Sequence, residues 1–181
     1  MKKSIIVLLL LIGTVVIAQE SASFTITVTV NYVDFTLRNA ADSAPYGTWG
    51  IGNLAAGSEA EMTVGTAGDH IFVDNQSNIA LSFKAYSTSA APTACGFGTA
   101  TAWAPATTAG TDEYKLEMGK GAVSALPTAY ATMDGGDEAG ADLVYSTTAG
   151  EDFHLYAKLT APTAVSDGCG HSITVYVLAT P

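Results

Sequence analysis

The sequence predicts an all-β protein, an antiparallel β-sandwich of the immunoglobulin-like or jelly-roll kind with about eight or nine strands. Three observations lead to this fold class. Short runs of alternating apolar and polar residues recur along the chain, turn-forming segments rich in glycine and proline separate them, and no stretch keeps a convincing helical period over three turns. Long irregular segments, at 87–110 and 119–140, connect some of the runs.

The first alternating run is long and begins almost directly after an N-terminal export signal. Threonines and Asn31 occupy one face, and the other face is apolar, with Phe24, Ile26, Val28 and Val30. This pattern predicts a strand over 20–31. The alternation slips by one residue at Tyr32–Val33, and such a slip moves every later side chain to the opposite face. We therefore expect a second strand over 33–38, which serves either another sheet or another molecule.

Residues 1–18 have the pattern of a signal peptide. Lys2 and Lys3 precede an apolar run, and Val16 and Ala18 stand at positions −3 and −1 of the expected cleavage site. The apolar run is short compared with the roughly 20 residues of a membrane span. We therefore expect cleavage rather than anchoring, with no membrane span in the mature chain. The expected locations are the extracellular space, the cell surface or the periplasm.

The mature chain, 19–181, is expected to form a single β-sandwich domain in which 19–31 is a separable N-terminal strand. The full chain carries 7 Lys and Arg against 17 Asp and Glu, and loss of Lys2 and Lys3 would leave 5 against 17, a formal charge of −12. Nucleic-acid phosphates and anionic lipids repel such a chain. The expected partners are other copies of the chain or other surface proteins.

The later strands are shorter alternating runs, bounded by turn-forming residues. They are predicted at 61–64, 70–74, 79–86, 113–118, 143–145, 153–159 and 173–177. A turn-rich segment at 39–58 and a polar hairpin loop at 75–78 connect the first of them. A short helix within 121–133 is an open alternative, since alanine and methionine favour helix there, while Pro127 argues against a long one.

Cys95 and Cys169 are the only cysteines of the chain. In an oxidising, exported setting an even pair most simply forms one disulfide. Closing a loop of this length would stabilise the fold by roughly 4 kcal/mol in the chain-entropy model. A redox-active or metal-ligating pair is the alternative, but the sequence has no CxxC spacing.

No arrangement of residues in the sequence predicts catalysis. His70, His154 and His171 are far apart in the chain and form no metal-binding or triad-like pattern, and no G-x-S-x-G elbow occurs. We therefore expect a protein that is not an enzyme and has no cofactor, with calcium as the one exception to consider.

Two further groups of residues suggest binding. Carboxylates on a glycine-rich segment can chelate Ca²⁺, although a solvated acidic loop explains them more simply; they are Asp134, Asp137, Glu138 and Asp142. Trp49 and Trp103 would be able to stack on a sugar ring, although Trp49 fits a core position equally well. A carbohydrate- or calcium-dependent binding module is therefore the alternative function.

The layout of the chain resembles exported prokaryotic immunoglobulin-like or jelly-roll surface proteins, and is similar to TasA-like matrix and pilus subunits. The resemblance lies in the strand after the signal, in Ile71-Phe-Val-Asp-Asn-Gln-Ser-Asn-Ile-Ala-Leu-Ser-Phe, and in the closing segments 153–162 and 173–177. It implies a structural subunit whose N-terminal strand inserts into the sheet of a neighbour and builds a filament. An ordinary internal edge strand of a monomer is the alternative for the same segment.

Overall fold

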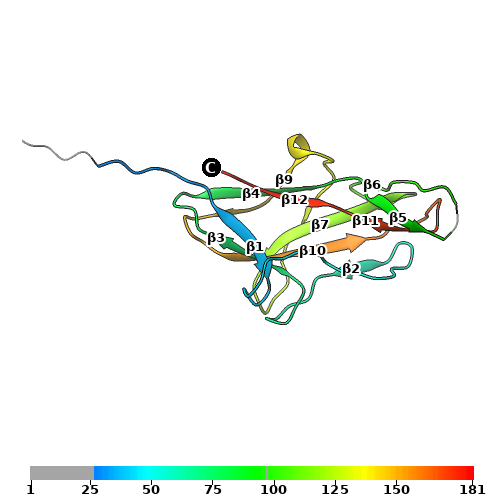
Figure 1. The fold of residues 1–181 in the computed structure, drawn as a ribbon, viewed down its shortest axis with the longest axis horizontal. Helices are drawn as coiled ribbons and strands as arrows, with labels where there is room; N and C mark the ends of the chain where they lie inside the picture. Colours follow the sequence, from blue (N-terminus) through cyan, green and yellow to red (C-terminus); the bar gives the residue numbers. More distant parts are fainter. Residues whose placement is uncertain (1–26, 97) are drawn as a thin grey trace, which may run out of the picture. The chain divides into compact units, whose positions relative to one another are not determined.

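A computed structural model describes residues 27–96 and 98–181 of the chain (Figure 1). The chain divides into two units, 1–30 and 31–181, and all the strands of the described residues belong to the second. Strands dominate this unit, and its one helical element among the described residues is the short 3-10 turn η1, Glu138–Gly140. The prediction of an all-β sandwich is confirmed.

The described residues form twelve strands, more than the sequence pattern predicts. They are β1 Phe35–Asn39, β2 Glu59–Glu61, β3 Ile71–Asn75, β4 Leu81–Ser87, β5 Ala91–Cys95, β6 Ala104–Pro105, β7 Glu113–Gly121, β8 Ala131–Thr132, β9 Asp142–Thr147, β10 Phe153–Thr160, β11 Cys169–Ser172 and β12 Val175–Thr180. Three of them, β5, β6 and β8, lie in segments that the pattern assigns to irregular structure, and the pattern predicts no strand over most of β11.

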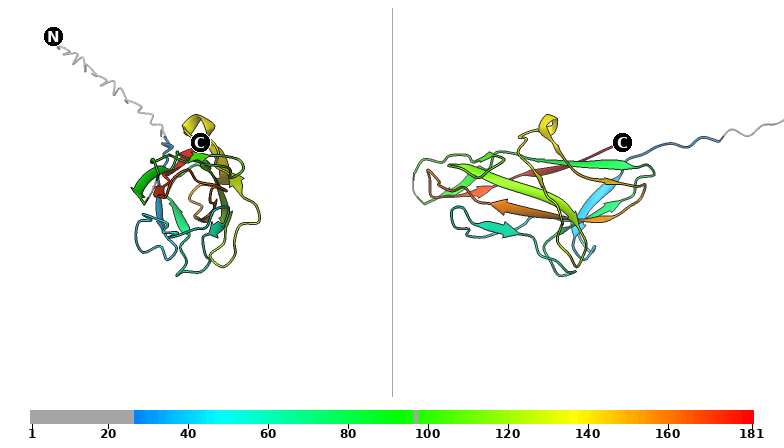
Figure 2. Two further views of the ribbon diagram at one scale, coloured as in Figure 1. Left: turned by 90° about the vertical axis from the view of Figure 1, so that its right-hand side faces the viewer. Right: turned by 180° about the vertical axis from the view of Figure 1, so that it is seen from behind.

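The largest sheet, here called the large sheet, has the strand order β1-β3-β10-β7-β6 and curls into a half-barrel (Figure 2). Its central strand β10 pairs with β7 from His154 to Thr160. On its other side, β10 pairs first with β3 and then with β2. Strand β8 adds to β7, and β6 is the one parallel neighbour of β7. The long, alternating β7 and β10 therefore organise the sheet.

A smaller sheet, with the order β12-β4-β9, faces the large sheet, and β5 pairs with β11 in a separate two-stranded ribbon. The two sheets meet through aromatic rings. The ring of Phe83 on β4 lies 5.2 Å from the ring of Phe35 on β1 and 5.0 Å from that of Phe153 on β10, edge to face in both cases. These contacts place the core between the sheets.

The core follows the period-2 alternation of the strands. Residues Leu81, Phe83 and Ala85 of β4 are buried, as are Leu116 and Met118 of β7. The apolar residues of β10 on the same face are also buried, namely Phe153, Leu155, Ala157 and Leu159. The sequence pattern therefore predicts the core-facing side of the main strands correctly.

The ribbon of β5 and β11 carries the disulfide. Cys95 and Cys169 are register partners in it, and their sulfurs are 2.03 Å apart. The expected pairing of the two cysteines is thus present in the structure. Disulfides of this kind are typical of proteins in oxidising compartments outside the cytoplasm.

The short helix left open for 121–133 is absent; Ala122 and Ala125 instead form a backbone bridge in a tight hairpin after β7. One prediction about secondary structure is wrong. The segment 27–34 is not in a strand, although alternation predicts one up to residue 31. An intrinsic preference for helix or strand is weak compared with the tertiary contacts that a segment makes. Phe24 and Ile26 lie outside the described residues.

Candidate functional site

A largely apolar groove of about 820 Å³ lies between the large sheet and the segments 46–54 and 169–177. One wall consists of inward-facing side chains of the large sheet, namely Leu37, Ile71, Leu116, Met118, Ala157 and Leu159. The other wall is formed by the loop 46–54 and by residues 169–175 together with Val177, which include all of β11 and the start of β12. The groove therefore runs beside β12.

Strand β12 has a hydrogen-bonded partner on one side only, among the strands that the structure describes. That partner is β4, which it meets in antiparallel register from Val175–Ser87 to Thr180–Ser82. Val175 and Val177 line the groove, whereas Tyr176, on the opposite face, stacks on Tyr86 with ring centroids 4.8 Å apart. An unpaired strand edge is a template for another strand, and here it borders an apolar groove.

The loop 46–54 is fixed in place by Asp69. The Tyr46 hydroxyl donates to the Asp69 carbonyl oxygen over 2.9 Å, and the Trp49 indole N–H donates to the Asp69 carboxylate over 3.0 Å. Burial raises the pKa of this carboxyl, but hydrogen bonds from Thr63 and Trp49 outweigh that effect and lower it. Asp69 is therefore ionised at neutral pH and holds this rim of the groove.

The opposite rim is formed by Trp103, which stacks on the ring of His171 at 3.8 Å between centroids and 18° between planes. The structure thus brings the two tryptophans of the sequence-based sugar-binding hypothesis to one groove. Both are already engaged: Trp49 gives its indole N–H to Asp69, and His171 covers one face of Trp103.

The four acidic residues of the calcium hypothesis do not converge. Asp134 and Asp142 face each other, and burial together with this neighbouring charge raises the pKa of Asp142. The Asp137 carboxylate caps η1 by accepting from the backbone N–H of Gly140 over 3.1 Å, and Glu138 is exposed. Within the described ranges, no three His, Cys, Asp or Glu side chains are placed to hold a metal ion.

Two of the histidines meet on the outer face of the large sheet, which the sequence did not indicate. His70 is fully buried; its Nδ1 lies 2.9 Å from the Thr63 carbonyl oxygen, and its Nε2 lies 3.0 Å from His154 Nδ1. Because a carbonyl only accepts, His70 donates through Nδ1 and accepts at Nε2 from His154. The ring of Tyr156 stacks on His70 at 4.5 Å. This pair is a packed structural element.

The histidine pair makes the fold sensitive to acid. Burial and the neighbouring His70 lower the pKa of His154. The unfolded chain therefore binds more protons than the folded one below the ordinary histidine pKa of about 6.5, and the free energy of unfolding falls as the pH drops through that value. We expect urea unfolding at pH 5 to show a lower stability than at pH 7. A His154→Gln variant should lose this part of the dependence, and an unchanged pH profile in that variant would contradict the assignment.

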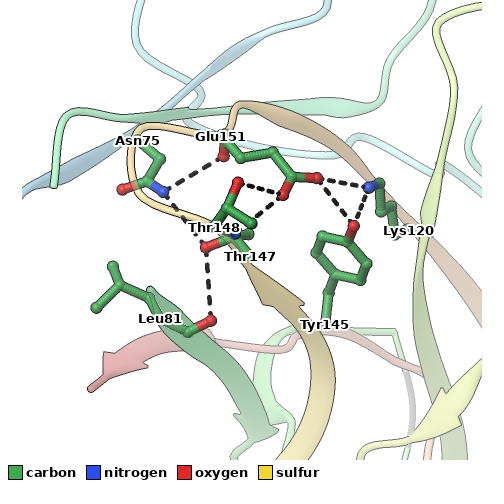
Figure 3. A network of polar contacts seen from close by, with 7 residues as sticks. All are labelled: Asn75, Leu81, Lys120, Tyr145, Thr147, Thr148 and Glu151. Carbon is green, nitrogen blue, oxygen red and sulfur yellow. Dashed lines mark hydrogen bonds and ion pairs between the residues drawn. The ribbon is translucent and has the colours of Figure 1, made fainter. Parts of the chain in front are cut away.

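A second polar cluster joins β7, β9 and the turn before β10 (Figure 3). The Glu151 carboxylate lies 3.0 Å from Lys120 Nζ and accepts from the Tyr145 hydroxyl over 2.9 Å. It also accepts from the Thr148 backbone N–H, and these bonds hold the pKa of Glu151 at about 2. Lys120 in turn lies over the Tyr145 ring, 3.7 Å from its centroid. The charged and polar groups of this cluster are all paired with one another. The cluster therefore links the strands and has the features of a structural element, not of a reactive site.

Comparisons with known proteins add no relative. No family model matches the chain, and no significant match exists among the curated proteins or the solved structures. In the part of the chain that the structure describes, no helix has the length and apolar character needed to cross a membrane. The candidate site therefore rests on the groove and on β12.

Proposed function

We propose that the protein is an exported, non-catalytic structural subunit that assembles at the cell surface or outside the cell by exchange of its N-terminal strand. Residues 19–31 of one copy would pair with the open edge of β12 in the next copy. The observation that carries this proposal is that an unpaired strand and an apolar groove lie side by side. Addition of a strand to a sheet edge is a recurring mode of peptide recognition.

The pattern of residues 19–31 matches what such a site needs. In an extended strand, side chains on one face repeat about every 7 Å, so Phe24, Ile26, Val28 and Val30 would all point into the groove. The threonines between them would face water. The backbone N–H and C=O groups of the segment would form hydrogen bonds with the unpaired edge of β12. The apolar face of the segment would fix the register in which the two strands pair.

The described part of this segment is consistent with the proposal. Val28 is 76% exposed, and residues 27–34 form no strand. The Tyr32 backbone N–H donates to Asn78 Oδ1 over 2.9 Å. At Asp34, the backbone N–H donates to Ser77 Oγ and the carbonyl accepts from the Gln76 N–H. Burying such apolar side chains is favourable by about 25 cal/mol per Å². The thirteen residues 19–31 would span about 43 Å when extended.

Exchange of this kind is head-to-tail and does not close, so it generates filaments rather than rings or dimers of fixed size. Each copy offers one segment and one groove. The intramolecular disulfide is compatible with the export that the N-terminal signal predicts. A disulfide forms and persists in an oxidising compartment, such as the exterior of the cell.

A carbohydrate- or calcium-dependent binding module remains the second candidate. The single observation in its favour is that Trp49 and Trp103 line the same groove. The inner wall of the groove, on the large sheet, is aliphatic, and the polar lining residues lie on the opposite wall, among them Thr48, Asn53, Ser172 and Thr174. A sugar site needs such hydrogen-bonding groups, but an apolar inner wall suits the apolar face of a strand better. The strand-exchange function therefore fits the groove better.

Assembly is tested by comparing the chain 19–181 with the chain 32–181 by light scattering and electron microscopy. We expect filaments from the first, and from the second a folded monomer with the same thermal midpoint. Two substitutions provide a matched pair: Ile26→Asp places a charge on the apolar face and should stop assembly, whereas Thr27→Asp, on the opposite face, should not. A monomeric 19–181 at high concentration, or an unfolded 32–181, would refute strand exchange.

A further inference from the structure

Two tyrosine rings are stacked on the outer face of the smaller sheet. Tyr86 on β4 and Tyr176 on β12 are register partners in the antiparallel pairing of these strands, which run side by side (Figure 1). Their ring centroids are 4.8 Å apart, and their planes differ by 14°. All eight tyrosines of the chain belong to the described residues, and this is the one stack of two tyrosines among them.

The stacked pair is open to reagents in the solvent. Tyr176 is 46% exposed and Tyr86 is partly exposed, whereas Tyr114 and Tyr156 are fully buried. Among the described residues, neither hydroxyl of the pair has a hydrogen-bond partner. An oxidant in solution can therefore reach both phenols, and no other described side chain holds their hydroxyl groups in place.

Two phenols in this arrangement are suited to oxidative coupling. One-electron oxidation of a phenol releases an electron and a proton and leaves a phenoxyl radical, whose unpaired electron is shared with the ring carbons next to the hydroxyl. Two such radicals combine through these carbons into a carbon–carbon bond, and in each ring one hydrogen then moves from carbon to oxygen. Over the whole step the two tyrosines lose two electrons and two protons. Hydrogen peroxide takes up both and is reduced to two molecules of water.

We propose that Tyr86 and Tyr176 form a site of dityrosine crosslinking, at which oxidation by peroxide joins β4 covalently to β12 within one subunit. The strand pairing holds the two rings together, so coupling within the pair is favoured over encounters with tyrosines of other chains. The motion that coupling requires is a rotation of the two side chains about their Cα–Cβ bonds, which brings the ring carbons next to the hydroxyls together.

The crosslink acts on the strand that borders the groove but does not enter the groove. Val175 and Val177 line the groove, whereas Tyr176, between them in the strand, projects to the opposite face. Strand β4 is the one described strand that pairs with β12, so a covalent bond between them prevents β12 from separating from its sheet. This inference does not depend on strand exchange, because the bond forms within one subunit.

The site is tested by treating a dilute solution of the chain 19–181 with a haem peroxidase and hydrogen peroxide. We expect the blue fluorescence of dityrosine, a single-subunit band on a denaturing gel and a mass lower by two hydrogen atoms. Proteolysis and mass spectrometry should find the peptide of Tyr86 joined to that of Tyr176. The crosslinked chain should unfold at a higher urea concentration than the untreated chain. The difference should be larger after reduction of the disulfide, because the disulfide already closes most of the same loop.

Tyr86→Phe and Tyr176→Phe keep an aromatic ring, so each should leave the thermal midpoint of the untreated chain unchanged and abolish the crosslink. Tyr130→Phe is the matched control and should leave the yield unchanged, because this partly exposed ring has Lys158 beside it and no tyrosine stacked on it. Absence of dityrosine, an undiminished yield in Tyr86→Phe, or linkage only between chains, for example through the exposed Tyr32, would overturn the proposal. These readouts are the same whether or not the chain forms filaments.

Discussion

Replacing both cysteines by serine is expected to lower the free energy of unfolding by roughly 4 kcal/mol, because the disulfide closes a loop between positions 74 residues apart. The effect should be large for a second reason. The ribbon of β5 and β11 has only two strands, and a two-stranded ribbon is marginal without other support. Urea unfolding of the oxidised protein and of Cys95→Ser/Cys169→Ser measures the difference.

The reduced parent chain provides the control for this prediction, because it lacks the bond but keeps both side chains. Its stability should match that of the double variant. Gly170, His171 and Ser172 of β11 line the groove, so loss of the bond should also weaken assembly at temperatures where the ribbon opens. A loss of stability below about 1 kcal/mol would show that the ribbon holds without the crosslink.

Val177→Lys is expected to raise the concentration needed for filament assembly by more than about 100-fold. Val177 lines the groove, and a donor strand would bury the new ammonium group without a partner, at a cost of about 3 kcal/mol or more. The isolated subunit should keep its stability, because the open groove leaves room for the lysine to reach water. Sedimentation of assembled material at increasing protein concentration gives the threshold.

Leu178→Lys is the matched control, since Leu178 is the next residue of β12 and points to the opposite face. It adds the same charge to the same strand outside the groove. Assembly should survive in this variant, apart from a modest salt-dependent effect. If the two variants assemble equally well, the groove is not where the donor strand lies.

Strands with strict alternation were predictable from the sequence, and for a clear reason. In β4, β7 and β10, one face is buried against the other sheet, so the period-2 pattern is enforced by the core. The short β6 and β8 are two-residue pairings onto β7 that carry no pattern of their own. The hairpin at 122–125 likewise depends on contacts with Gly65 and Tyr156 from elsewhere in the chain.

Only one half of the candidate site, the donor strand, could be predicted from the sequence. The apolar face of 19–31 is visible in the sequence, but the groove depends on which strand edge remains unpaired, and that is a property of the topology. The contacts of the histidines could not be predicted from the sequence, for the same reason. His70 and His154 are 84 positions apart, and His171 and Thr101 are 70 apart, so only the folded chain brings them together.

Burial and the neighbouring His70 lower the pKa of His154, so the fold is expected to lose stability in acid. Assembly experiments should therefore be carried out at a fixed pH near neutrality.

Strand exchange is tested most directly by adding a peptide of residues 19–31 to the chain 32–181 and following the backbone amide signals by NMR. Saturable one-to-one binding is expected, with the largest changes in β12 and along the groove, and with slowed amide exchange on the open edge of that strand. The Ile26→Asp peptide should not bind. Absence of binding at millimolar peptide, or changes confined to other strands such as β1, would contradict the proposal that the groove receives the N-terminal strand of another copy.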